Sequence, residues 1–266
     1  MELRRNIYIK LLAWKKENTG RVLELQGARQ VGKTYILKSL EKKTFPKWSI
    51  LIWQENTGKN FLRCVSIAME WEPGKPMEET PIRKALELYD ETFKDNKDTV
   101  VIIDEIQESA EIYNQIRTLA REFQAYVIVT GSYLGRTMEL DFFLPAGDMD
   151  HMVMESMTFD EFLDVFDERE LYEKIDLYGK GRTEDYKKLM EYYEIYQKIG
   201  GYPAVVACYA EYRDLNKCMG LIGDLINVFA DESKRYFEDI IDINMFQKLF
   251  NAIALLMMQE KQAFGI

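Results

Sequence analysis

A glycine-rich segment that ends in a lysine and a threonine has the residue types needed to bind a phosphate chain. The segment, GARQVGKT, runs from Gly27 to Thr34 and has the spacing Gly-x-x-x-x-Gly-Lys-Thr. Glycines let the backbone approach a ligand closely, so that amides can point at phosphate oxygens. In such a segment Lys33 would reach the β- and γ-phosphates, and the Thr34 hydroxyl would bind magnesium. The predicted phosphate-binding residues, of the Walker A kind, are Gly27, Ala28, Arg29, Gln30, Val31, Gly32, Lys33, Thr34 and Tyr35.

Two acidic residues after an apolar run can complete such a site. The run TVVII ends in Asp104 and Glu105. Alone, this pair is typical of a solvated turn. Beside a phosphate loop, the first carboxylate can hold magnesium through water, and the second can orient or deprotonate the attacking water. We therefore expect Thr34 and Asp104 at the metal and Lys33 and Glu105 in catalysis, with Asp104 in the Walker B role.

Other polar residues are weaker candidates for the same site. The strand end TGS places Ser132 where it could sense the γ-phosphate or position water. Arg136 could contact phosphate within the chain or reach a neighbouring subunit. Arg29, inside the loop, could steer phosphate or brace a partner surface. Arg117 and Arg121 are more typical of solvated helix positions.

The nucleotide base is inferred by elimination, together with the family resemblance given below. Guanine-binding proteins carry Asn-Lys-x-Asp after a strand, whereas the nearest string here, DNKDTV, has the wrong spacing and precedes its strand. ATP is therefore the expected nucleotide. Tyr8 and Tyr35 are possible stacking partners of the base, although an aromatic residue near a loop is more often part of the core.

Strands and helices must alternate to position these residues. An amphipathic helix is expected at the start, with Ile7, Leu11 and Trp14 on one face. The predicted strands are RVLEL (21–25), TVVIIDEIQ (99–107), YVIVTGS (126–132) and HMVMESM (151–157), with WSILIW (48–53) or CVSIAMEW (64–71) as a further, undecided strand. Helices are expected after the phosphate loop, near 82–94 and at 111–123. This alternation predicts a parallel sheet covered on both faces.

Beyond about residue 158 the pattern becomes acidic, aromatic and helical. Thr158 and Glu161 have the spacing of a capping box at a helix start. The segment GGYP, residues 200–203, separates two helical stretches.

Composition limits the partners. The formal net charge is −10, from 45 acidic and 35 basic residues, so nucleic-acid binding has no support from overall charge. Cys64, Cys208 and Cys218 lack a Cys-x-x-Cys pair and are expected to be reduced structural thiols in a cytoplasmic protein. The single histidine, His151, is expected to lie passively on a strand. Long apolar runs are missing from the sequence, so no membrane association is expected.

The motifs together resemble a specific family. GARQVGKT, DEIQ after an apolar strand and TGS after the next strand resemble the prokaryotic AAA-type ATPases whose C-terminal part is called DUF4143, with an AAA_14-like ATPase domain. TFDEFL, IGGYPAVV and NAIALLMMQEKQAF are similar to later segments of that family, so the resemblance covers nearly the whole chain. It implies an α/β P-loop NTPase of the additional-strand, AAA-like class, with strand order 5-1-4-3-2 and a smaller helical region after the sheet.

The resemblance also implies a domain plan. It comprises an ATPase domain at residues 1–158, a helical lid or linker at 159–235, and the start of a truncated winged-helix-like segment at 236–266. Asp148 stands where many members carry a basic residue, which puts a basic phosphate contact at that position in doubt. Family members usually continue into a nuclease-like region, so we expect this chain to be a fragment of a longer protein.

Three functions are consistent with these features to different degrees. The favoured one is magnesium-dependent ATP hydrolysis that drives movement of the helical region. A nucleotide-gated switch with little turnover is the alternative, because an isolated subunit could lack an arginine supplied by a neighbour. A small-molecule kinase would need an arginine-rich lid, which the acidic helices do not resemble. A homo-oligomer or a missing C-terminal module is a possible partner.

Overall fold

The protein is built around one parallel sheet. The structure is a computed structural model that describes residues 3–45, 48–52, 56–70, 81–131, 147–176 and 182–237, together with 248, 249 and 252. The strands of the sheet are β1 (Val22–Gln26), β2 (Trp48–Ile52), β3 (Thr99–Ile103), β4 (Tyr126–Gly131) and β5 (Met149–Val153). Their order is β2-β3-β4-β1-β5, with every pairing parallel. The expected order 5-1-4-3-2 is confirmed.

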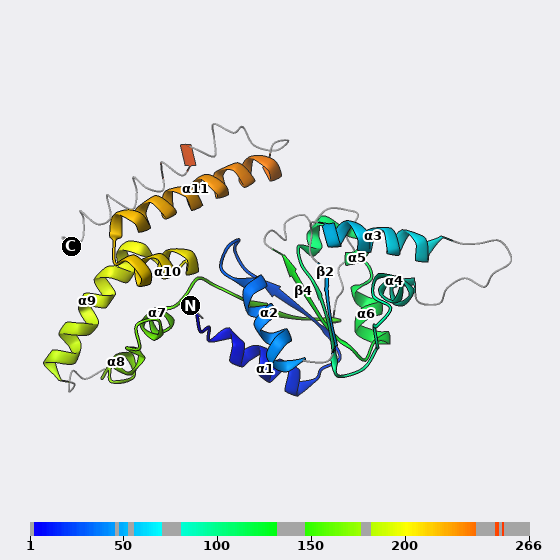
Figure 1. The fold of residues 1–266 in the computed structure, drawn as a ribbon, viewed down its shortest axis with the longest axis horizontal. Coiled ribbons are helices and arrows are strands. Elements are labelled where there is room, and N and C mark those ends of the chain that lie inside the picture. Colours follow the sequence, from blue (N-terminus) through cyan, green and yellow to red (C-terminus); the bar gives the residue numbers. More distant parts are fainter. Residues whose placement is uncertain are drawn as a thin grey trace.

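Helices cover both faces of the sheet (Figure 1). On one face, α1 (Ile7–Glu17) and α2 (Lys33–Thr44) pack against side chains such as Leu23 and Ile102. On the other face lie α3 (Asn56–Met69), α4 (Pro81–Tyr89), the 3₁₀ helix η1 (Ile106–Glu108), α5 (Ala110–Tyr113) and α6 (Ile116–Glu122). All five residues of β3 are buried, as expected for a central strand with helices on both sides.

The two undecided segments have different structures. Residues 48–52 form β2, whereas residues 64–69 belong to α3. Phe61, Val65 and Ala68 are buried at helical spacing, while Ile67 is 57% exposed. The apolar run from Cys64 therefore carries the buried side of an amphipathic helix and does not join the sheet.

Several predicted boundaries were wrong. The strand expected at 99–107 ends at Ile103, and residues 106–108 form η1. The helix expected at 82–94 ends at Tyr89, after which the Asp90 carboxylate accepts a hydrogen bond from the Thr92 backbone N–H (2.9 Å). The helix expected at 111–123 is divided into α5 and α6, and the Ser109 hydroxyl caps α5. The last strand begins at Met149, two residues before the predicted start at His151, and ends at Val153.

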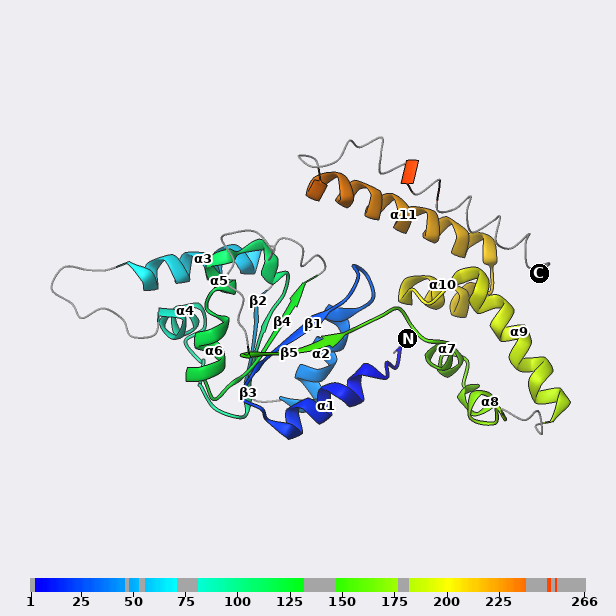
Figure 2. The same cartoon turned by 180° about the vertical axis from the view of Figure 1, so that it is seen from behind.

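A helical region follows β5 and lies beside the sheet (Figure 2). It contains α7 (Phe159–Asp164), α8 (Arg169–Glu173), α9 (Thr183–Ile199), α10 (Pro203–Tyr212) and α11 (Leu215–Phe237). These helices bury their own core, which includes Phe162, Leu163, Val205 and Val206. The capping box at Thr158 and Glu161 is present at the start of α7. Residues 154–158 connect this region to the sheet.

Three further sequence expectations concern membrane spans, the thiols and the single histidine. Within the described residues, no helix is both long and apolar enough to span a membrane. Cys64, Cys208 and Cys218 are free cysteines, and burial raises the pKa of the Cys218 thiol to about 11. His151 lies on β5 as expected, with its Nδ1 2.7 Å from Oε2 of the buried Glu24.

Candidate functional site

The glycine-rich segment forms the loop between β1 and α2, at the carboxyl edge of the sheet. Its backbone has positive φ angles at Gly27 (154°), Gln30 (64°) and Gly32 (99°). A Cβ atom at Gly27 would lie 2.3 Å from the Met154 carbonyl oxygen, so only glycine fits there. We call residues 27–34 the phosphate loop. α2 begins at Lys33, which directs the positive end of the helix dipole and its first amides at the loop.

Lys33 is held close against the loop. Its Nζ donates hydrogen bonds to the carbonyl oxygens of Gly27 (2.6 Å) and Ala28 (3.1 Å). Burial lowers the pKa of Lys33, and the nearby carboxylates of Glu105 and Asp104 act in the opposite direction. The side chain therefore brings a cationic group between the loop and the two acidic residues.

Asp104 connects the ends of three elements. It follows β3, and its Oδ2 accepts a hydrogen bond from the Thr34 hydroxyl on α2 (3.1 Å). Its Oδ1 accepts one from the buried Thr130 hydroxyl on the neighbouring strand β4. Hydroxyl and carboxylate oxygens are the ligands that magnesium prefers, and Mg²⁺ in such sites uses few protein ligands besides phosphate oxygens. Thr34 and Asp104 thus fit a magnesium site.

Glu105 has an unusual backbone conformation. Its φ of 53° lies in the left-handed region, which is uncommon for glutamate and is found mostly where the surroundings enforce it. Oε2 of Glu105 accepts a hydrogen bond of 2.6 Å from Nε2 of Gln107. Gln107 is fully buried, and within the described part of the chain its Oε1 has no hydrogen-bond partner. A buried amide therefore orients the carboxylate.

These groups surround one cavity of about 500 Å³, within the size range of small-molecule sites. Its lining consists of Arg29, Gln30, Gly32, Lys33, Thr34, Tyr35, Lys38, Asp104 and Glu105. Three cationic side chains thus face the same space as two carboxylates. Such an arrangement suits a polyanion that binds together with a divalent cation.

Of the remaining candidates, two fall outside the described residues and two form ion pairs. Ser132 and Arg136 are outside the described residues. Arg117 and Arg121 are not merely solvated, because both form ion pairs with Asp148, at 3.3 and 2.9 Å. The hydrogen bond from Arg121 lowers the pKa of Asp148.

Asp148 and Tyr8 occupy places that the sequence did not indicate. Asp148 precedes β5, and its carbonyl accepts a hydrogen bond from the N–H of Val22, at the amino end of β1 and thus away from the phosphate loop. Asp148, which stands where many family members carry a basic residue, is therefore not at the cavity. The Tyr8 hydroxyl lies 3.4 Å from the hydroxyl of Thr44, the last residue of α2. The phosphate loop joins the opposite end of this helix, so Tyr8 lies away from the loop.

Sequence reasoning missed the roles of two buried residues. The hydrogen bonds of Thr130 to Asp104 and of Gln107 to Glu105 position the acidic pair. Gln107 is two residues after Glu105 in DEIQ, so its proximity was visible in the sequence, but its complete burial was not. Thr130 was noted only as part of a polar strand end.

The chain matches one family model and resembles several solved structures. The model of a family described as an AAA domain matches residues 19–163. Similar solved structures include C. elegans PCH-2 (17% identity, TM-score 0.43, covering 81% of this chain and 62% of that chain). A second is Drosophila ORC bound to DNA, with 10% identity, a TM-score of 0.45, and coverage of 82% of this chain and 66% of that chain. A third is the Aeropyrum pernix ORC1 protein in complex with DNA, with 14% identity, a TM-score of 0.40, and coverage of 89% of this chain and 62% of that chain. This chain spans less than two thirds of the length of each. A search of curated proteins gave no match.

Proposed function

The chain belongs to the AAA domain family, and on this basis we propose that it binds ATP with magnesium and hydrolyses it. The hydrolysis cycle would move the helical region α7–α11 relative to the sheet. Of the family resemblance seen in the sequence, the AAA-type ATPase domain is established, whereas the DUF4143 relationship and the domain limits 1–158, 159–235 and 236–266 belong to the proposal.

One observation carries the proposal. Lys33, Thr34, Asp104 and Glu105 come from two separate segments, and the fold places all four on a single cavity of about 500 Å³. An ordinary glycine turn or an ordinary acidic turn would not need to lie next to the other. The arrangement supplies amide donors and a lysine for phosphates, oxygen ligands for a cation and a carboxylate for water.

Each residue then has a specific task. The loop amides and Lys33 hold the phosphate chain, which keeps the γ-phosphate in place relative to Glu105. Thr34 and Asp104 would hold magnesium, which supplies charge neutralisation for the phosphate oxygens. Glu105, oriented by Gln107, accepts a proton from the attacking water or aligns it. Ser132 and Arg136 stay candidates for a γ-phosphate contact, with Arg136 acting within the chain or on a neighbouring subunit of a homo-oligomer.

The test is ATP turnover with magnesium over a wide range of protein concentration. We expect turnover in the wild type, and a loss of kcat on the order of 10²–10⁴-fold in Glu105→Gln with nucleotide affinity retained, because general-base catalysis contributes this much. Glu111→Gln is a matched control, since Glu111 is an exposed glutamate on α5.

The concentration series separates the two functional hypotheses. Turnover per subunit that rises with concentration indicates a site completed by a neighbouring subunit. Tight ATP binding without turnover at any concentration would favour the nucleotide-gated switch and reduce Glu105 to a structural carboxylate. Absence of ATP binding would contradict both.

A further inference from the structure

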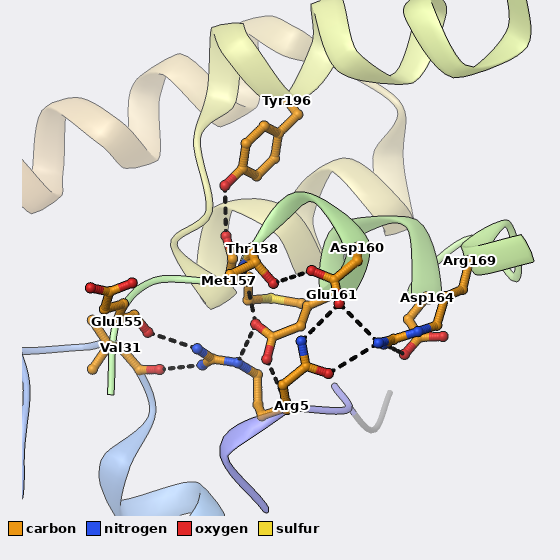
Figure 3. Close-up of polar contacts among 11 residues, drawn as sticks. Arg5, Val31, Glu155, Met157, Thr158, Asp160, Glu161, Asp164, Arg169 and Tyr196 are labelled. Carbon is orange, nitrogen blue, oxygen red and sulfur yellow. Dashed lines mark hydrogen bonds and ion pairs between the residues drawn. The ribbon is translucent and has the colours of Figure 1, made fainter. Parts of the chain in front are cut away.

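A buried arginine next to the phosphate loop contacts three separate parts of the chain (Figure 3). Arg5 precedes α1 and is 8% exposed. Its Nη1 donates to the Val31 carbonyl in the loop (2.7 Å), its Nη2 to the Glu155 carbonyl in the connection after β5 (2.7 Å), and its Nε to Oε2 of Glu161 on α7 (2.9 Å). A planar guanidinium can serve such divergent acceptors together, whereas an ammonium group cannot.

Glu161 is equally well satisfied. Oε2 accepts from Arg5 and from the Thr158 N–H (3.1 Å), and Oε1 accepts from the Asn6 N–H (2.5 Å). Glu161 is 3% exposed, so this is a buried ion pair whose hydrogen bonds offset its desolvation. We call Arg5, Asn6, Val31, Glu155 and Glu161 the Arg5 junction.

The contact with Val31 bears on the orientation of a loop amide. The Val31 carbonyl and the Gly32 N–H belong to one peptide unit, and in a trans peptide these two groups point in opposite directions. The chain has no cis peptide among its described residues. Holding the Val31 carbonyl toward Arg5 therefore directs the Gly32 N–H away from Arg5. Gly32 lines the cavity, so this amide is one of the donors available to a phosphate.

A second network secures the same N-terminal segment to the helical region. The Asn6 side chain donates to Asp160 (2.7 Å) and accepts from Arg169 (3.2 Å). Arg169 also pairs with Asp160 and Asp164, both at 2.9 Å. This network reaches α7 and α8 without touching the phosphate loop, which makes it a natural control for the Arg5 junction.

From this geometry we propose that Arg5 is a positioning residue of the phosphate loop, and that its pairing with Glu161 makes the loop conformation depend on where α7 lies. The inference rests on the proposed function, because it names the residues through which nucleotide binding and the helical region are coupled. A shift of α7 changes the position of Glu161, then of the Arg5 guanidinium, and then of the Val31–Gly32 peptide.

The test measures the affinity of a fluorescent ATP analogue with magnesium, at temperatures well below unfolding. We expect Arg5→Gln to weaken affinity on the order of tenfold or more, because it removes a charge-assisted hydrogen bond that orients the loop. Glu161→Gln should weaken affinity as well, although Glu161 makes no hydrogen bond to the loop. Arg5→Lys should rescue only in part. Arg169→Gln should bind as the wild type does.

Two further measurements keep the test decisive. The double variant Arg5→Gln, Glu161→Gln removes both charges and so avoids an unpaired buried carboxylate if Arg5→Gln alone folds poorly. Hydrogen exchange without nucleotide should show faster exchange of amides 27–34 in the Arg5 variants and no change there in Arg169→Gln.

The possible results are distinguishable. Normal affinity and normal loop exchange in the folded Arg5 variants would overturn the inference alone. Equal weakening in Arg169→Gln would also overturn it, since the junction would then act only by holding the fold together. If the wild type binds no nucleotide, the proposed function fails and the inference fails with it.

Discussion

The phosphate loop and the Arg5 junction share the Val31–Gly32 peptide, yet they are built in different ways. The loop consists of consecutive residues, five of which line a cavity. The junction is centred on the buried ion pair of Arg5 and Glu161, which are 156 positions apart in sequence. A contiguous loop has a recognisable spacing, whereas a junction of distant residues has none. The comparison indicates that the part that binds ligand and the part that sets the loop's conformation can be separated by mutation.

Among the variants that test this comparison, the largest expected effect comes from Lys33→Ala. Removing the Lys33 ammonium group from the cavity should weaken ATP binding by about 100-fold, the loss expected for charge-assisted hydrogen bonds to phosphate. Stability should change by only about 1 kcal/mol, because relief of the buried charge opposes the loss of its bonds to Gly27 and Ala28. Titration with a fluorescent nucleotide and chemical denaturation measure the two effects. Lys42→Ala, an exposed lysine on the same helix, is the control.

Wild-type affinity in Lys33→Ala would break the comparison, because the loop would then not be the binding part.

Gly201→Ala should instead have its main effect on stability. A Cβ there would lie 2.0 Å from the Met157 carbonyl oxygen, so the connection to the helical region must shift. We expect a loss of at least about 1–3 kcal/mol in unfolding free energy, as for other overpacked sites. Gly223→Ala on α11, where a Cβ meets nothing within 4 Å, should instead add about 0.5–1 kcal/mol. Denaturant unfolding measures both variants, and equal stability of the two would contradict the packing argument.

The smallest effect is expected for Gln107→Leu. Loss of the 2.6 Å hydrogen bond to Glu105 should lower kcat about tenfold and leave KM nearly unchanged, because the bond orients a catalytic group without touching nucleotide. Steady-state kinetics over a range of ATP concentrations measure kcat and KM, with the exposed Gln124→Leu as control. A raised KM with unchanged kcat would move Gln107 from catalysis to binding.

Most of the sheet could be predicted from the sequence. Its strands are short apolar runs between turn residues, and the family resemblance supplied their order. The two helix errors have local causes, because Ser109 and Asp90 bond to nearby backbone groups and so start or stop helices. The spacing of apolar residues does not reveal such side-chain to backbone hydrogen bonds. For residues 64–69, the helical period is visible only when the apolar run is extended back to Phe61, which is buried together with Val65 and Ala68.

The site could be predicted in part for a related reason. Lys33, Thr34, Asp104 and Glu105 belong to motifs in which residue type and spacing carry the chemistry. Gln107 and Arg5 do not, because their roles depend on burial. Arg4 and Arg5 look alike in the sequence, but Arg4 is exposed and Arg5 is buried. Glu161 was correctly expected as a capping residue, and only the fold shows that its carboxylate also pairs with Arg5.

The connection between the sheet and the helical region has mechanical consequences. At its first residue, the Met154 N–H bonds to Gln26 (2.8 Å), next to the Gly27 site where no side chain fits. At Met157, the N–H bonds to Gly201 (2.7 Å), and the carbonyl accepts from Tyr196 (2.8 Å). Because the connection is hydrogen-bonded at both ends, we expect a rotation of the helical region to be transmitted to the sheet. Insertion of one residue between 154 and 157 would lengthen the connection, and the helical region could then rotate without moving the sheet.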